Sequence, residues 1–359
     1  MIKVLVVDDS ALVRRILTEE LNQQKDIQVV GSAMDPYVAR EKIVELKPDV
    51  ITLDLEMPRM DGLSFLSRLM KHYPMPVVVV SSLAPRNSEN ALMALQLGAV
   101  EVICKPGSAY STQDISMQLA RAIRTASVAR FEKGFASGNG RKPAGPVSTD
   151  KVRLIKTTSK IVAIGASTGG TRAIEAILTR LPGDMPGIAM VQHMPPVFTT
   201  GFAERLNKIC AMEVREAKDG DCLEQGVALL APGNYHMIVE KSGARYYVRV
   251  KEGPPVHHQR PSVDVLFNSV AQAAGVNAVG ALLTGMGADG AKGMLAMKQA
   301  GALTMAQDEH TSVVFGMPKE AIRIGAADQV LPLQKFPEEL VNAISRQRES
   351  NRQRHTLTD

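Results

Sequence analysis

The sequence predicts two α/β domains, each built on a doubly wound parallel sheet. Short apolar runs alternate with amphipathic segments along most of the 359 residues, and polar residues follow the ends of many runs. A segment rich in Gly, Ser, Pro, Lys and Arg divides this pattern in two. A chain of this length should form about two domains, and 45% hydrophobic residues can fill two cores. We expect a first domain, a flexible linker, a second domain and a disordered tail at residues 1–124, 125–155, 156–348 and 349–359.

The first domain reads as five β–α units of a flavodoxin-like fold. Apolar runs without alternation are typical of parallel strands covered by helices on both faces. We expect such strands at residues 2–7, 27–30, 50–53, 77–80 and 102–104. Helix ends are also recognisable, because Ser10 can cap the first helix, Asp35 precedes a proline at the second, and Gly98 can close the fourth.

Polar residues follow four of these strands. Asp8 and Asp9 follow the first strand, and Asp54 follows the third. Ser81 and Lys105 follow the fourth and fifth. Ligands of such sheets bind beyond the carboxyl ends of the strands, so these side chains should share one crevice. Three carboxylates repel one another unless a hard cation binds them, and Mg²⁺ takes carboxylate, water and phosphate oxygens. The pattern therefore predicts a site for a metal ion and a phosphoryl group.

The motifs V-V-D-D-S, L-D-L-E-M-P-R-M-D-G and C-K-P resemble the response-regulator receiver domain of two-component signalling. The resemblance implies that Asp54 accepts phosphate from a histidine kinase. It also implies contacts from Ser81 and Lys105 to the phosphoryl oxygens, and a Mg²⁺ site formed by Asp9, Asp54 and the backbone carbonyl of Glu56, with Asp8 in support. Val102 stands where the family often has an aromatic residue, which puts the aromatic part of the family's switch in doubt.

Composition excludes several classes of function. The basic excess lies in residues 121–160 and 345–359, which predicts solvated, flexible segments rather than a nucleic-acid-binding surface. Residues 1–10 carry two acids where a secretion signal would be apolar, and no apolar run approaches the ~20 residues that span a bilayer. We expect a cytoplasmic protein.

The second domain is expected to be Rossmann-like, with a β-hairpin inserted. Strands are predicted at residues 161–166, 188–191, 227–230, 278–283 and 302–305. Helices are predicted at residues 171–179, 263–274 and 291–300, and the hairpin at 236–240 and 245–250. Ser262 precedes an apolar periodic run and is interpreted as a helix cap.

Ser167 lies in G-A-S-T-G, a G-x-S-x-G pattern between an expected strand and an expected helix. This context is that of a nucleophilic serine at a sharp turn, where helix amides can stabilise an oxyanion. A phosphate-binding turn is the alternative, although neither G-x-G-x-x-G nor a Walker lysine is present.

The best-placed base and acid follow two other strands. His193 comes just after the strand at 188–191, and Asp289 lies in L-L-T-G-M-G-A-D-G-A after the strand at 278–283. Asp289 could instead cap the following helix. The remaining histidines of this domain fall in the hairpin or in loops, namely His236, His257, His258 and His310. A Ser-His-Asp order differs from the orders of α/β-hydrolases, chymotrypsin and subtilisin, which implies another scaffold.

The motifs G-A-S-T-G-G, Q-H-M-P, R-P-S-V-D-V-L-F and L-T-G-M-G-A-D-G-A occur in this order and resemble the chemotaxis protein-glutamate methylesterase domain. The resemblance implies a triad of Ser167, His193 and Asp289, with Thr168 and Met286 lining the site. It implies hydrolysis of glutamate methyl esters on the cytoplasmic helices of chemoreceptors, with release of methanol and without a cofactor for the ester chemistry. Deamidation of receptor glutamines is implied as well.

Two domains of this kind suggest a switch and the enzyme it controls. We expect the unphosphorylated first domain to cover the Ser167 edge, and phosphorylation of Asp54 to weaken that packing. A tenfold activation needs only ~1.4 kcal/mol of coupling. An acyl-enzyme and direct attack by water activated at His193 both remain open. The competing classes are an output domain that only binds a partner and a nucleotide-binding domain.

Overall fold

The computed structural model describes residues 1–57, 60–81, 85–105, 112–129 and 160–355. The chain divides into two compact units, Met1–Arg141 and Lys142–Asp359. Most of the expected linker, residues 130–155, lies outside the described residues. Among the residues that are described, no helix combines the length and the apolar character that crossing a membrane requires.

The first unit contains a five-stranded parallel sheet in the order β2-β1-β3-β4-β5. Its strands are β1 (Ile2–Val7), β2 (Ile27–Ala33), β3 (Val50–Leu53), β4 (Val77–Ser81) and β5 (Glu101–Cys104). Its helices are α1 (Ala11–Asn22), α2 (Pro36–Leu46), α3 (Gly62–His72), α4 (Pro85–Leu97) and α5 (Thr112–Ser127). This strand order is that of flavodoxin-like folds, so the predicted fold class is confirmed. Helix α5 runs into the segment expected as linker.

Local chemistry explains where the first two helices begin. The Ser10 hydroxyl accepts a hydrogen bond from the Val13 amide at 3.4 Å. Asp35 accepts from the amide of Tyr37 at 2.9 Å and from that of Val38 at 3.0 Å. Such side chains satisfy helix amides that have no intrahelical partner, and Pro36 needs none because it has no amide hydrogen. Both predicted caps are therefore present.

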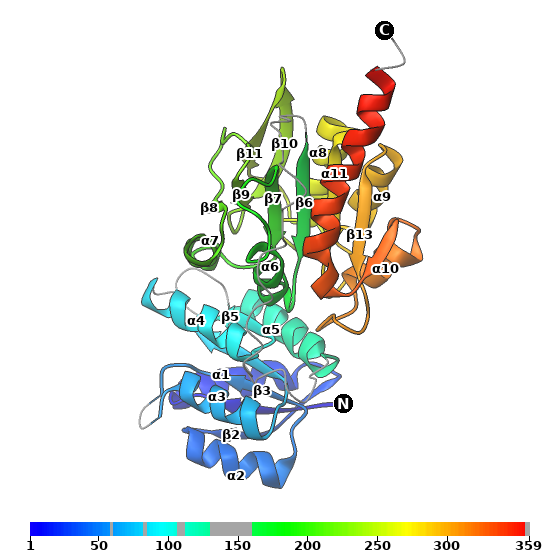
Figure 1. The fold of residues 1–359 in the computed structure, drawn as a ribbon. Coiled ribbons are helices and arrows are strands. Elements are labelled where there is room, and N and C mark those ends of the chain that lie inside the picture. The colour runs from blue at the N-terminus through cyan, green and yellow to red at the C-terminus, as the bar shows by residue number, and fades with distance from the viewer. Residues whose placement is uncertain (58–59, 82–84, 106–111, 130–159, 356–359) are drawn as a thin grey trace. The chain divides into compact units, whose positions relative to one another are not determined.

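The second unit contains a seven-stranded parallel sheet in the order β14-β13-β12-β6-β7-β9-β8 and a separate antiparallel hairpin (Figure 1). The sheet strands are β6 (Ile161–Ala166), β7 (Gly187–Gln192), β8 (Glu213–Glu216), β9 (Val227–Leu230), β12 (Ala278–Leu282), β13 (Leu303–Gln307) and β14 (Gln329–Leu331). The hairpin pairs β10 (His236–Ser242) with β11 (Arg245–Lys251). The predicted parallel sheet with an inserted hairpin is confirmed.

Helices cover this sheet on both faces (Figure 1). They are α6 (Gly170–Leu178), α7 (Phe198–Ile209), α8 (Val263–Ala274), α9 (Ala291–Gln299), α10 (Met317–Arg323) and α11 (Phe336–His355), with short 3₁₀ turns at Gly275–Asn277 and Leu333–Lys335. Helix α11 continues to His355, which differs from the disordered tail expected from residue 349.

The central strands β6, β7 and β12 end together and set the place of the candidate site. Residue pairing is in register from Ile161 to Ala166 across β6 and β7, and from Ile161 to Gly165 across β6 and β12. A Cβ on Gly165 would lie 2.2 Å from Cγ1 of Val263, so the start of α8 packs directly on β6. Glycine at this position thus brings the first turn of α8 to the carboxyl edge of the sheet.

Candidate active site

Ser167 lies at the end of β6, at the turn into α6. Its amide donates to the Thr284 carbonyl on the neighbouring strand end at 3.0 Å, and its carbonyl accepts from the Gly170 amide at 2.7 Å. The N-cap of α6 is Gly169 at φ 78°, in the left-handed region that favours glycine. A Cβ there would also lie 2.7 Å from Val313. The glycines of the motif therefore allow a tight strand-to-helix turn that presents Ser167.

His193 lies beside this turn on the next strand. Its amide donates to the carbonyl of Ala166 at 3.1 Å, which continues the β6–β7 ladder by one residue. Gln192, a residue that the sequence interpretation did not single out, bridges the two positions. Its buried side-chain amide donates to the carbonyls of Ser167 at 2.9 Å and His193 at 3.1 Å. Only the Q-H-M-P motif could have indicated Gln192.

Asp289 contacts the imidazole directly. Its Oδ2 atom lies 2.8 Å from Nε2 of His193, and both side chains are almost fully buried. Nδ1 of His193 is buried and has no hydrogen-bond partner within the described residues. No hydrogen bond joins the Ser167 hydroxyl to the imidazole in the described structure. The structure thus brings His193 and Asp289 together, with Ser167 on the adjacent strand end.

Groups at the start of α8 donate the other hydrogen bonds to the Asp289 carboxylate. Oδ1 accepts from the Ser262 hydroxyl at 2.8 Å and from the Asp264 amide at 3.0 Å, and Oδ2 accepts from the Val263 amide at 2.7 Å. Ser262 also caps α8, since its hydroxyl accepts from the Val265 amide at 3.4 Å. The predicted cap at Ser262 is confirmed, but its bond to Asp289 was not foreseen.

These contacts fix the charge state of Asp289. Burial acts to raise the pKa of this carboxyl, but hydrogen bonds from His193 and from the amides of Asp264 and Val263 outweigh it, so the pKa lies below its ordinary value. The N-terminus of α8 also favours a negative charge through the helix dipole. Asp289 is therefore an ionised partner that can hold the Nε2 proton of His193.

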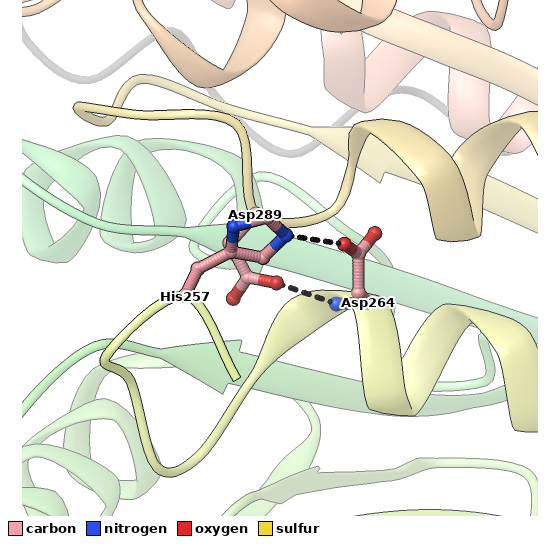
Figure 2. A group of neighbouring side chains, drawn as sticks. All are labelled: His257, Asp264 and Asp289. Carbon is pink, nitrogen blue, oxygen red and sulfur yellow. Dashed lines mark hydrogen bonds and ion pairs between the residues drawn. The ribbon is translucent and has the colours of Figure 1, made fainter. Parts of the chain in front are cut away.

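Two other histidines of this unit make different contacts. His236 Nε2 lies 3.0 Å from the Pro254 carbonyl, and His257 Nε2 lies 3.1 Å from Oδ2 of Asp264. Ligand atoms of His257, Asp264 and Asp289 lie within 4.8 Å of one another. Figure 2 shows these three neighbouring side chains. The carboxylate oxygens of both aspartates accept hydrogen bonds from protein groups, so the cluster is a hydrogen-bond network rather than an open metal site.

The expected lining residues lie on the same edge. Thr168 is buried, and its carbonyl accepts from the Thr284 hydroxyl at 2.9 Å. Met286 follows Gly285, where a Cβ would lie 2.6 Å from that of Ser167. The backbone before Met286 therefore passes directly against the candidate nucleophile.

A second cluster lies at the carboxyl edge of the first unit. Ligand oxygens of Asp8, Asp9 and Asp54 lie within 4.8 Å of one another. Lys105 Nζ lies 2.7 Å from Oδ2 of Asp54 and forms a looser ion pair with Asp8 at 2.9 Å. The Ser81 hydroxyl is buried and has no partner within the described part of the chain. The structure therefore gathers the side chains of Asp8, Asp9, Asp54 and Lys105, and the Lys105 amide donates to the Ser81 carbonyl at 2.8 Å.

Electrostatics at this cluster favour an added cation. Burial raises the pKa of Asp54 above its ordinary value, and the hydrogen bond from Lys105 only partly opposes this. For Lys105, burial acts to lower the pKa, but its bonds to Asp54 and Asp8 outweigh it and raise the pKa. Two buried carboxylates thus share one ammonium group. Val102, which stands where receiver domains often have an aromatic residue, is buried.

Comparisons with known proteins match family models to the two parts of the chain that contain these clusters. A family model described as CheB methylesterase matches residues 162–340, and one described as response regulator receiver domain matches residues 4–114. The chain is 58% identical to a protein of Syntrophus aciditrophicus named protein-glutamate methylesterase/protein-glutamine glutaminase 2, over 96% of this chain and 99% of that protein. The chain belongs to the CheB methylesterase family. A Salmonella typhi protein with the same name, without the number, is 51% identical over 96% of this chain and 97% of its own.

A solved structure of the CheB methylesterase catalytic domain from Thermotoga maritima resembles the second unit. The identity is 39%, the TM-score is 0.51, and the match covers 52% of this chain and 99% of that one. The CheB methylesterase match contains Ser167, His193 and Asp289, and the receiver match contains Asp54 and Lys105. Both clusters therefore lie inside the segments that define the family.

Proposed function

We propose that this chain hydrolyses methyl esters of glutamate side chains on the cytoplasmic helices of chemoreceptors, releasing methanol for chemotactic adaptation. We propose that it also deamidates receptor glutamines. The observation that carries the proposal is the 2.8 Å hydrogen bond between His193 and Asp289 at the sheet edge that presents Ser167. Methanol release from methylated receptor membranes tests it. The expected result is release that depends on the protein, and the absence of release by folded, phosphodonor-treated protein would reject it.

In the proposed reaction, Ser167 Oγ attacks the ester carbonyl while Nδ1 of His193 takes its proton. Nδ1 is the nitrogen available for this task, because Nε2 bonds Asp289 and Nδ1 has no partner in the described structure. His193 then protonates the departing methoxide, and water releases the acyl group by the same steps. A glutamine substrate reacts in the same way, with ammonia as the leaving group.

Charge on the reacting carbonyl oxygen needs stabilisation in the transition state. The amides of Thr168 and Gly169 precede α6, whose N-terminus favours negative charge. We assign them as oxyanion donors, each worth on the order of 2.7 to 4 kcal/mol in comparable enzymes. No cofactor takes part in this chemistry.

The proposed phosphorylation site is Asp54, with a histidine kinase as phosphodonor. Its neighbours fit Mg²⁺, because the donor set is three carboxylates of which two are buried, and both buried carboxylates pair with the single ammonium group of Lys105. We assign Asp9, Asp54 and the Glu56 carbonyl as direct ligands, with Asp8 in support. When bound, the ion would offset negative charge on the phosphoryl group. The free hydroxyl of Ser81 and the ammonium of Lys105 would then contact the phosphoryl oxygens.

Replacing Asp54 with asparagine should abolish activation while leaving basal methanol release intact, because the acceptor oxygen belongs to the first unit and the residues proposed for ester hydrolysis belong to the second. The measurement compares release with and without a small-molecule phosphodonor in Mg²⁺ buffer. A matched control is Asp61→Asn, since Asp61 is an exposed carboxylate that caps α3. The control should respond as the wild type does. A full response by Asp54→Asn would contradict the assignment.

Deleting residues 1–150 should leave a folded enzyme with raised basal activity, because we propose that the first unit covers the Ser167 edge before phosphorylation. The second unit supports such a design, since it has a buried core of its own. Methanol release per mole of protein, in the absence of phosphodonor, measures the effect. Equal or lower activity in a truncated protein with normal cooperative unfolding would argue against occlusion.

A further inference from the structure

Next to Asp289 lies a second histidine–aspartate pair, His257 and Asp264, that the proposed mechanism does not use (Figure 2). The buried Asp264 side chain accepts from the Gly293 amide at 2.7 Å through Oδ1 and from His257 Nε2 at 3.1 Å through Oδ2. The backbone amide of the same residue donates to Asp289. Asp264 therefore connects Asp289 to two further segments of the chain.

The first connection joins α8 to α9. Gly293 lies in the first turn of α9, where amides lack an intrahelical partner, and the Asp264 carboxylate satisfies this one. A Cβ on Gly293 would lie 2.7 Å from Cβ of Phe267 and 3.0 Å from the Asp264 carbonyl, so the two helices are in direct contact. Asp289 lies two residues before α9. Asp264 thus anchors both the helix that bonds Asp289 and the helix that follows it.

The second connection is a tight turn formed by residues 256–259. Val256 and Gln259 exchange backbone hydrogen bonds of 3.0 and 2.8 Å, and the two residues between them, His257 and His258, have φ of 51° and 61°. Positive φ at both central residues is the pattern of a type I′ turn, which strongly favours Asn-Gly. Two histidines there strain the backbone, and strained backbone that persists points to a local function. The His257–Asp264 hydrogen bond gives this turn such a function.

The surroundings of Asp264 disfavour the charged form of its carboxyl group. Burial raises its pKa, and the nearby charge of Asp289 adds to this, while the Gly293 amide and His257 oppose it. His257 is the partner that lies on the solvent side, because its side chain is partly exposed whereas Asp264 is buried. Removing His257 therefore takes one hydrogen-bond partner from the Asp264 carboxylate, which lies next to Asp289.

We propose that Asp264 and His257 are positioning residues for ester hydrolysis, holding the first turn of α8 against Asp289 and thereby fixing the His193 imidazole. This inference rests on the proposed function of Ser167, His193 and Asp289. Neither residue contacts the Ser167 turn in the described structure, so they act through Asp289. Loss of the pair should lower kcat and leave KM unchanged, because a small displacement of a base affects the chemical step rather than substrate binding.

The decisive experiment is a pair of asparagine variants in the full-length, phosphodonor-activated protein. His257→Asn suits the left-handed turn but is too short to reach Asp264, so it removes the contact without disturbing the turn. His258→Asn makes the same change one residue later, at an exposed side chain with no contact to Asp264. We expect kcat for methanol release to fall about threefold or more in His257→Asn and to stay unchanged in His258→Asn. KM should match the wild type in both.

Asp264 variants complete the test. Asp264→Ala should lower kcat by about tenfold at constant KM, and Asp264→Asn should recover part of this loss because it keeps an acceptor for the Gly293 amide. Unchanged kcat in both Asp264→Ala and His257→Asn, an effect on KM alone, or equal losses in His257→Asn and His258→Asn would overturn the inference. Asp289→Ala is measured in parallel. If that variant stays active, the proposed catalytic machinery itself fails, which is a separate outcome.

Discussion

Replacing Ser167 with alanine is expected to reduce methanol release by a factor on the order of 10⁴ to 10⁶, because the variant lacks the nucleophilic oxygen. The side chain makes no hydrogen bond in the described structure, so the free energy of unfolding should change by less than about 1 kcal/mol. The assay is release of methanol from methylated receptor membranes, with thermal unfolding recorded on the same preparations.

Ser242→Ala is the matched control, since Ser242 is exposed at the end of the hairpin strand β10. It should hydrolyse at the wild-type rate. Activity of Ser167→Ala within about tenfold of wild type would point to water activated directly at His193, because an enzyme without its nucleophile loses far more than that. A function that persists without any methanol release would instead favour a binding-only output domain.

Asp289→Asn is expected to lower the rate by about 10⁴-fold, because an amide cannot accept all four hydrogen bonds and leaves the imidazole in the wrong tautomer. Whichever way the amide is oriented, its NH₂ group faces donors from the first turn of α8 or from His193. Losing charge-assisted hydrogen bonds at a buried site should also reduce the free energy of unfolding by about 2 kcal/mol or more. Asp184→Asn, at an exposed aspartate of the same unit, should change neither quantity.

The pH dependence of stability gives an independent check on Asp289. Its pKa is lowered in the folded state, so its contribution to stability is present above the ordinary aspartate value of about 3.9 and is lost as pH falls through the folded value. Unfolding midpoints measured from pH 6 down through that range should therefore fall less steeply for Asp289→Asn than for wild type. Parallel curves would show that the contacts of Asp289 do not depend on its charge.

The sequence predicts the central strands well because burial on both faces leaves only apolar residues there. Strands β6 and β9 match their expected bounds, and helix α8 does as well. The same pattern of apolar residues does not predict the edge strands. Strand β8 reads E-V-R-E and β14 reads Q-V-L, because an edge strand pairs on one side only and can be short and polar.

The candidate site also has residues that the sequence reveals and contacts that it does not reveal. Ser167 and Asp289 stand in glycine-rich turns after apolar strands, which is a local signal that one sequence can reveal. The contacts of Ser262 and Asp264 with Asp289 join residues more than twenty positions apart, and they arise because Gly165 lets α8 pack on β6. The spacing of residues along the sequence does not predict such packing. The catalytic roles of these residues stay predictions until they are tested by substitution.

The most direct test of the account is a double-variant comparison of methanol release. Ser167→Ala, His193→Ala and the combined variant are assayed on the same methylated receptor membranes with phosphodonor present. If the hydroxyl and the imidazole act as one unit, the combined variant should be no slower than the slower single variant, as in other serine hydrolases. Losses that multiply in the combined variant would show that the two side chains act independently, and would contradict the account.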